Sequence, residues 1–254
     1  MTKVSLLGTG TSQGVPVIGC GCEVCRSLDF RDKRLRTSVH IAEGEKSFVI
    51  DTGPDFRQQM LRENINRLDA VIFTHGHKDH TAGLDDVRAY NFIQRMDMPV
   101  YGEKFLLEQL RVEFYYAFEP RKYPGIPRLE LIEIKDQPFD VSGVKFMPLP
   151  VHHLNMPVLG FRIHDFSYIT DANFIPDATL EKLKGTKILV LNALQREHHL
   201  SHFNLDEAMA MALRIGAGQT YFTHISHKLG THKEIQKELP PSVALAYDGL
   251  SVTL

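Results

Sequence analysis

Short apolar runs rich in β-branched residues recur along the whole chain and predict strands. The ten predicted strands are 3–7, 47–51, 70–74, 98–101, 144–149, 159–163, 166–170, 187–192, 219–223 and 243–246. Longer stretches with apolar residues at helical spacing predict helices at 54–63, 103–114, 176–183 and 204–215. The last helix opens on Asn204 with Glu207 three positions later, which is the pattern of a capping box.

The order of these elements indicates an α/β fold. Strands come in blocks, and helices separate the blocks without following every strand. Two such halves, roughly 1–115 and 130–254, predict two packed sheets with helices on the outside. The aromatic and proline-containing segment 115–125 between the halves is expected to form an ordered surface loop. Because no repeat or composition shift marks a boundary, we expect a single domain over residues 1–254.

Charge and cysteine content exclude several classes of protein. The 254 residues contain 29 Lys and Arg against 31 Asp and Glu, a formal charge of −2, so no global positive field recruits nucleic acid or an anionic membrane. The apolar run 1–8 is too short for a signal peptide or a membrane span, and we expect a cytoplasmic location. Cys20, Cys22 and Cys25 lie within six positions, and this odd count favours metal binding over disulfides.

A histidine and aspartate cluster follows the predicted strand 70–74. His75, His77, Asp79 and His80 lie on the loop that leaves the strand's carboxyl end. The first two can point to one place and the last two to an adjacent place, an arrangement that serves two metal ions a few ångströms apart. Nitrogen and oxygen ligands suit Zn, Mn or Fe. A surface loop with three histidines by chance is the alternative interpretation, and their density in six positions disfavours it.

Two metal ions need more ligands than this loop supplies, and the ends of other predicted strands offer them. His152 and His153 follow the strand at 144–149, Asp171 follows 166–170, and His224 follows 219–223. An aspartate can bridge two ions with its two oxygens. Any one of these residues alone would have a structural interpretation, but together with the first loop they predict a two-metal site.

These motifs resemble the metallo-β-lactamase superfamily, whose hallmark is a His-x-His-x-Asp-His loop. The resemblance runs from Val4 to Asp248 and implies a four-layer αββα sandwich. Asp51 matches an early aspartate that orients the metal loop without binding metal. Within this superfamily, the chain is most similar to the branch that contains ribonuclease Z and the cyclic-phosphate phosphodiesterase of phosphonate breakdown. Four segments carry that likeness: 8–16 (GTGTSQGVP), 20–25 (CGCEVC), 83–88 (GLDDVR) and 157–162 (PVLGFR).

The resemblance implies a ligand set for each ion. One Zn or Mn ion would take His75, His77 and His153, the other would take Asp79, His80 and His224, and Asp171 would bridge them. The distance from the family histidine to the run at 157–162 favours His153 over His152. A third, structural zinc would take Cys20, Cys22, Cys25 and His227; three reduced cysteines without metal are the alternative. Ribonuclease Z lacks this cysteine cluster, so the motif favours the phosphodiesterase.

The resemblance also implies catalytic residues. His202 precedes a helix with the family's Leu-x-x-Ala pattern and would be the general acid, while Asp79 would take part in catalysis as well as bind metal. His198 and His199 are interpreted as solvated loop residues. Arg88, Arg121, Lys122 and the tyrosines of 115–123 are candidates to hold a substrate phosphate, although a solvated loop explains them equally well.

The leading hypothesis is a hydrolase of a small phosphodiester, such as phosphoribosyl 1,2-cyclic phosphate. One alternative is tRNA 3′-end processing of the ribonuclease Z kind, which the near-neutral charge and the lack of a long basic insertion disfavour. Hydrolysis of a thioester or lactam is a second alternative. A non-catalytic cofactor-biosynthesis protein on the same fold is a third, and the complete ligand set argues against it. We expect no membrane or nucleic-acid partner, and a homodimer would be ordinary for this class.

Overall fold

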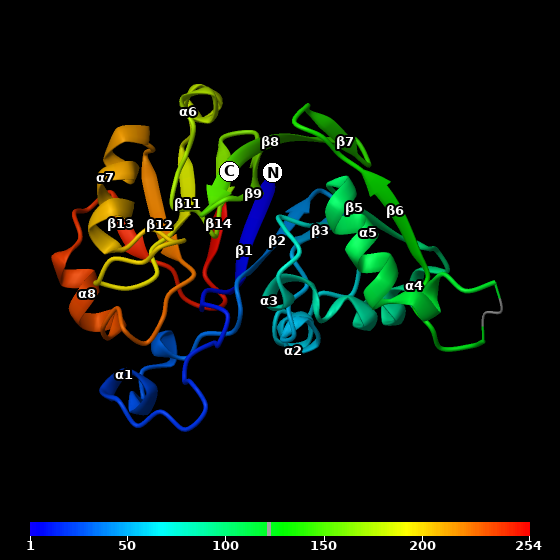
Figure 1. The fold of residues 1–254 in the computed structure, drawn as a ribbon, viewed down its shortest axis with the longest axis horizontal. Coiled ribbons are helices and arrows are strands. Elements are labelled where there is room, and N and C mark those ends of the chain that lie inside the picture. The colour runs from blue at the N-terminus through cyan, green and yellow to red at the C-terminus, as the bar shows by residue number, and fades with distance from the viewer. Residues whose placement is uncertain (121–122) are drawn as a thin grey trace.

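Two sheets of seven strands each form the centre of the protein in this computed structural model, which describes residues 1–120 and 123–254 (Figure 1). The first sheet has the order β14 (Ser251–Thr253), β1 (Thr2–Gly8), β2 (Ser38–Glu43), β3 (Lys46–Ile50), β4 (Ala70–Ile72), β5 (Met98–Gly102), β6 (Leu129–Glu133). The second has the order β13 (Val243–Leu245), β12 (Gln219–Thr223), β11 (Ile188–Asn192), β10 (Phe166–Ile169), β9 (Met156–Ile163), β8 (Val144–His153), β7 (Phe139–Val141).

Helices lie on the outer side of each sheet (Figure 1). Next to the first sheet are α2 (Phe56–Arg62), α3 (Lys78–Thr81), α4 (Arg88–Gln94) and α5 (Lys104–Glu113), and next to the second are α6 (Asp177–Leu183), α7 (Leu205–Ile215) and α8 (His232–Glu238). The short helix α1 (Glu23–Arg26) and three 3-10 turns, Phe30–Asp32, Leu84–Val87 and Tyr115–Ala117, complete the set. In the part of the chain that the structure describes, no helix is long and apolar enough to cross a bilayer.

Three apolar clusters hold these layers together. One lies between the sheets and includes Phe48 and Phe146, whose rings meet edge to face at 5.6 Å. The second contains residues of α2, α4 and α5 with the first sheet, and the third contains residues of α6, α7 and α8 with the second sheet. Burial of apolar surface on both faces of each sheet is what an αββα sandwich requires. The predicted four-layer fold is therefore confirmed.

Parallel pairing brings several strand ends to one edge of the molecule. Strands β3 to β6 pair in parallel, and so do β10 to β13. Because the carboxyl ends of parallel strands meet at one edge of a sheet, the residues that follow β3, β4, β10 and β12 lie near each other. The backbone N–H of Leu159 on β9 donates to the carbonyl of Thr74 (3.1 Å), which ties the two sheets together at this edge.

Most predicted elements are present, with two corrections. All ten predicted strands overlap observed ones, and the Asn204–Glu207 capping box forms as expected. The proposed division into halves is wrong, because β14 returns to pair with β1 and β6 extends the first sheet beyond residue 115. The strands β2, β6, β7 and β14 and the helices α1, α3, α4 and α8 were not predicted, and α3 contains Asp79 and His80, which the sequence placed on a loop. The apolar residues of these elements are too few to show a period.

Candidate metal centre

Four chain segments leave their strands and converge at the common edge. Asp51 follows β3, the segment His75 to His80 follows β4, Asp171 follows β10 and His224 follows β12. Asp51, Asp171 and His224 have φ angles of 65°, 53° and 56°, in the left-handed region that residues other than glycine rarely adopt. Such backbone strain is retained mainly at functional sites, where the surrounding structure holds it in place.

Asp171 lies at the junction of the cluster. Its Oδ1 is 3.0 Å from His224 Nδ1 and 3.4 Å from His80 Nε2, whereas its Oδ2 is 3.7 Å from His75 Nε2. The four residues Asp79, His80, Asp171 and His224 place one ligand atom each within 4.8 Å of one another, as do His75, His77 and Asp171. The two oxygens of one carboxylate thus face two separate groups of side chains, which is the arrangement expected of a bridging ligand.

The structure brings His153 to the same centre. Its ring centroid is 5.2 Å from that of His77 and 6.0 Å from that of His75. One ring nitrogen of His153 lies within 4.8 Å of ligand atoms of Asp171 and His202. Its Nδ1–H donates to the carbonyl of Ser201 (2.7 Å), which leaves Nε2 as the ligand atom. His152, the neighbouring alternative, packs its ring 5.8 Å from Phe174, so the choice of His153 agrees with the geometry.

The chemistry of the cluster fits metal ions. His80 Nε2 and His224 Nδ1 are buried and make no hydrogen bond with any described residue, although carboxylates lie close to both. Burial alone would lower the pKa of His80, but the carboxylates of Asp171, Asp51 and Asp79 hold the pKa well above its usual value. The centre therefore has a strongly negative potential and unpaired nitrogen donors. Nitrogen and oxygen donors without thiolates suit Zn, Mn or Fe.

Asp51 lies behind the centre, next to the loop. Its Oδ1 accepts a hydrogen bond from the backbone N–H of Thr74 (2.9 Å), and its Oδ2 accepts one from the Thr74 hydroxyl (2.8 Å). Asp51 does not belong to any of the close ligand groups. The expected role of orienting the metal loop agrees with this placement.

Four supporting contacts have no counterpart in the sequence pattern. Gln109 on α5 donates from Nε2 to the carbonyl of Gly76 (2.6 Å) and to Glu113 Oε1 (2.7 Å), and Lys78 pairs with the same Glu113 carboxylate. On the opposite side, the Thr11 hydroxyl lies 3.4 Å from His224 Nε2. The helical pattern at 103–114 predicted the helix, but apart from the Gln109–Glu113 bond within it these contacts join residues far apart in the chain.

His202 is buried beside the candidate ligands, with 8% of its surface exposed. Its ring lies 4.5 Å from that of His153 and is stacked 4.8 Å from that of His224. Burial, and secondarily His224, lowers the pKa of His202 to about 3, so the ring is neutral in the metal-free chain. His198, whose Nδ1 is 3.1 Å from Glu207, is mostly exposed as expected, whereas His199 lies closer, with its ring 5.2 Å from that of His202.

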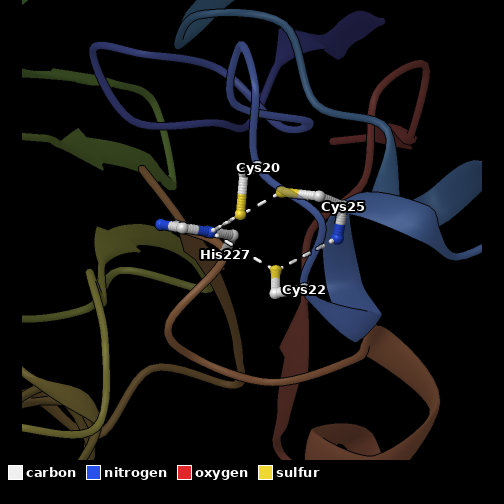
Figure 2. Close-up of side chains that lie close together, drawn as sticks. All are labelled: Cys20, Cys22, Cys25 and His227. Atoms are coloured by element: carbon white, nitrogen blue, oxygen red, sulfur yellow. Dashed lines mark hydrogen bonds between the residues drawn. The ribbon is translucent and has the colours of Figure 1, made fainter.

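The cysteine cluster forms a second, separate group with His227 (Figure 2). The Nδ1 of His227 is 3.2 Å from Cys20 Sγ, 3.4 Å from Cys22 Sγ and 3.6 Å from Cys25 Sγ. A tetrahedral zinc with ordinary bond lengths separates nitrogen and sulfur ligands by about 3.6 Å. A hydrogen bond from the backbone N–H of Cys25 is the main cause that lowers the pKa of the Cys22 thiol to about 6. These four residues therefore place their ligand atoms close enough together to hold one metal ion.

The predicted phosphate-binding residues are less well placed. Arg88 pairs with Asp85 (3.1 Å) and contacts the carbonyl of Gly125. Arg121 and Lys122 lie outside the described residues. Tyr115 and Tyr123 are more than half exposed. The structure thus supplies no contact between Arg88 or these tyrosines and the candidate metal ligands.

Comparison with known proteins agrees with this geometry. A family model described as a beta-lactamase superfamily domain matches residues 46–225. The crystal structure of a diphosphatase from the PhnP family superimposes with a TM-score of 0.94 at 40% identity, covering 100% of this chain and 98% of that one. A ribonuclease Z of a Mycobacterium species is 26% identical over 88% of this chain and 84% of its own.

An octanoyltransferase of Porphyromonas gingivalis is 41% identical over 98% of this chain. The chain spans about half the length of that relative, 51%. The chain therefore belongs to the metallo-β-lactamase superfamily, and within it to the PhnP-like branch. It is a hydrolase-fold protein related to the PhnP-family diphosphatase, and the family predicted from the sequence is confirmed.

Proposed function

We propose that this chain is a two-metal phosphodiesterase that acts on a small substrate. The observation that carries the proposal is the carboxylate of Asp171, whose two oxygens face two separate groups of candidate ligands. A site with two ions a few ångströms apart is typical of enzymes that displace an oxygen substituent from phosphorus. The geometry thus supports hydrolysis of a phosphate ester more directly than it supports binding alone.

The chain offers a complete ligand set for both ions. His75, His77 and His153 would hold one Zn or Mn ion, and Asp79, His80 and His224 would hold the other, with Asp171 between them. When bound, such ions lower the pKa of a shared water toward neutrality and polarise a phosphoryl oxygen. Asp79 would also be catalytic, because its second carboxylate oxygen is available to accept a hydrogen bond from the attacking water.

His202 would be the general acid that protonates the leaving oxygen. It lies beside His153 and His224, which puts it within reach of a substrate bound at the centre. The imidazole is neutral in the free chain, so a bound phosphate anion would have to raise its pKa before it could donate a proton. General acid catalysis by histidine contributes about 10²–10⁴-fold.

The third ion in the proposal is a structural zinc. Cys20, Cys22, Cys25 and His227 would fill all four tetrahedral positions, which leaves no open position for a substrate. His227 lies three positions after His224, so one segment would contribute to both metal sites. We assign this zinc to holding the N-terminal loop against the second sheet.

Two substrate classes follow from different observations. The sequence motifs favour a small cyclic phosphodiester such as phosphoribosyl 1,2-cyclic phosphate. The full-length relative at 40% identity is named a diphosphatase, which favours a diphosphate linkage as the second candidate. The acyl transfer in the name of the Porphyromonas gingivalis relative is not carried over, because the chain matches only about half of that protein.

A purified, metal-loaded enzyme tests the proposal directly. It is assayed against bis-p-nitrophenyl phosphate, phosphoribosyl 1,2-cyclic phosphate, 2′,3′-cyclic nucleotides, a nucleotide diphosphate sugar and precursor tRNA. We expect turnover of a small substrate, abolished in Asp171→Asn, and none of precursor tRNA. Preference for the diphosphate sugar would select the second candidate. Cleavage of precursor tRNA alone, or no cleavage of any of these, would reject the proposal.

A further inference from the structure

A pocket adjoins the metal centre on the side of His75 and His77. It has a volume of about 520 Å³, within the range of about 300–1,000 Å³ that is common for ligand pockets. We propose that this pocket binds an uncharged, apolar substituent of the substrate, the group that stays on phosphorus during hydrolysis. This inference rests on the proposed phosphodiesterase function but names a third substrate class, an acyclic diester, because a cyclic sugar phosphate or a diphosphate-linked sugar would keep a polar group on phosphorus.

Apolar side chains form the outer walls of the pocket. Phe105 and Leu106 come from the first turn of α5, and Met156 and Pro157 come from the start of β9. Phe105 has 78% of its surface exposed, which is unusual for a large aromatic residue next to a polar centre. A ligand that covers this ring would remove apolar surface from water, and such burial is favourable for an apolar group.

The charges in the pocket disfavour a second phosphate. Lys78 is the one cation among the described lining residues, and its Nζ is already paired with Glu113. The carboxyl group of Glu103 also lines the pocket, and burial followed by the nearby Asp136 raises its pKa. Beyond an ion held by His75 and His77, an anionic group placed here would meet a carboxylate and no unpaired cationic side chain among the described lining residues.

The position of His202 gives the substrate a direction. His202 does not line this pocket, and its ring lies against those of His153 and His224, neither of which lines it. If His202 protonates the leaving oxygen, the leaving group lies toward His202. The remaining ester substituent then lies toward Phe105.

The test uses p-nitrophenyl esters of methyl, butyl and octyl phosphate, which share one leaving group and differ only in the retained chain. Each fully buried methylene is worth about fourfold in affinity, so for a partly open pocket we expect kcat/KM to rise at least about tenfold from methyl to octyl. Phe105→Ser should flatten this dependence. Val112→Ser, at a residue of α5 that is 77% exposed and does not line the pocket, is the matched control and should keep it.

Calorimetric binding of methyl and octyl phosphate to the metal-loaded protein separates the two proposals. Tighter binding of octyl phosphate that Phe105→Ser abolishes, without any turnover of diesters, would reject the phosphodiesterase and support the pocket. Hydrolysis of the diesters at a rate that does not depend on the length of the retained alkyl chain would reject the proposed pocket and support the phosphodiesterase function. A dependence that persists in Phe105→Ser, or a preference for carboxyalkyl over alkyl esters, would likewise reject the pocket.

Discussion

The Nδ1 of His80 lies 2.7 Å from Oδ2 of Asp51, and neither side chain has any surface exposed to solvent. With the Nδ1 proton held by Asp51, Nε2, the atom that points to Asp79 and Asp171, is the nitrogen that a cation would deprotonate and bind. A carboxylate behind a metal-binding histidine fixes its tautomer and increases its basicity. Asp51 therefore prepares His80 for a cation.

Replacing Asp51 by Asn should weaken metal binding without unfolding the chain. The amide keeps the size of the side chain but removes the charge behind His80, and loss of such partners typically costs about 10–100-fold in metal affinity. Competition with a chelator measures the affinity. Asp177→Asn, at a side chain 88% exposed, is the matched control and should bind like the wild type. Unchanged affinity in Asp51→Asn would contradict this role.

Replacing His202 by Ala should leave the metals in place and remove most turnover. For a substrate with an alkoxide leaving group, we expect kcat to fall by about 10²–10⁴-fold. For a p-nitrophenyl ester the loss should be much smaller, because that leaving group departs without a proton. Elemental analysis of the variant supplies the check. Loss of one active-site ion would make His202 a ligand and exclude the acid role.

Replacing Cys22 by Ser should remove one equivalent of zinc. The remaining ligands no longer close a tetrahedral site, and structural zinc contributes directly to folding free energy. We expect a lower melting temperature together with one zinc fewer per chain. Glu23→Gln, at the exposed next position, serves as the control. Equal zinc content in Cys22→Ser and the control would show that the cysteines hold no metal.

Two glycines next to the metal loop should tolerate alanine differently. A Cβ on Gly53 would overlap the carbonyl oxygen of Asp79, which is backbone, whereas a Cβ on Gly76 would overlap the end of the Gln109 side chain. Gly76→Ala can displace Gln109 and lose about 1 kcal/mol of hydrogen bonding. Gly53→Ala should cost more, about 2–4 kcal/mol in the free energy of unfolding. Urea denaturation of both variants measures the difference, and equal values would refute the contact geometry.

His40 should make stability depend on pH. Burial, and next the charge of Lys3, lowers the pKa of His40 to about 4 in the folded chain, below the unfolded value of 6.5. The folded state therefore keeps its full stability above pH 6.5 and loses it as the pH falls toward 4. After allowance for partial exposure we expect about 1–3 kcal/mol. The measured quantity is the difference in the free energy of unfolding between the wild type and His40→Gln, because metal release at low pH affects both proteins. This difference should shrink as the pH falls from 7 to 4. A constant difference would contradict it.

The sequence pointed to most of the candidate active-site ligands because they follow apolar strands. Asp171 and His224 follow strands whose parallel pairing carries them to the same edge. The four-layer arrangement followed from the same strands and from the family motifs. His152 and His153 lie on opposite sides of β8, because alternate residues of a strand do; His153 is near the centre and His152 is beside Phe174.

The remaining features depend on contacts between distant residues. Nothing near Gln109 shows that it bonds to Gly76, 33 positions away, or that Thr11 contacts His224. The last strand, β14, has three residues, too few for a period, and its partner β1 is at the other end of the chain. The left-handed backbone at Asp51 is not visible in the sequence either, because aspartate tolerates this conformation but occurs far more often outside it.

The segment that contains His224 and His227 is fixed by backbone bonds to the N-terminal loop, from Ile225 N–H to Thr9 O (2.9 Å) and from Thr11 N–H to Ile225 O (3.1 Å). An ion held by the cysteines would therefore also order the backbone from which His224 extends. Thermodynamic linkage requires this help to be reciprocal, so each occupied site would raise the affinity of the other by the same factor. Loading would then be cooperative, and the protein would pass from empty to full over a narrower range of free metal concentration than independent sites allow.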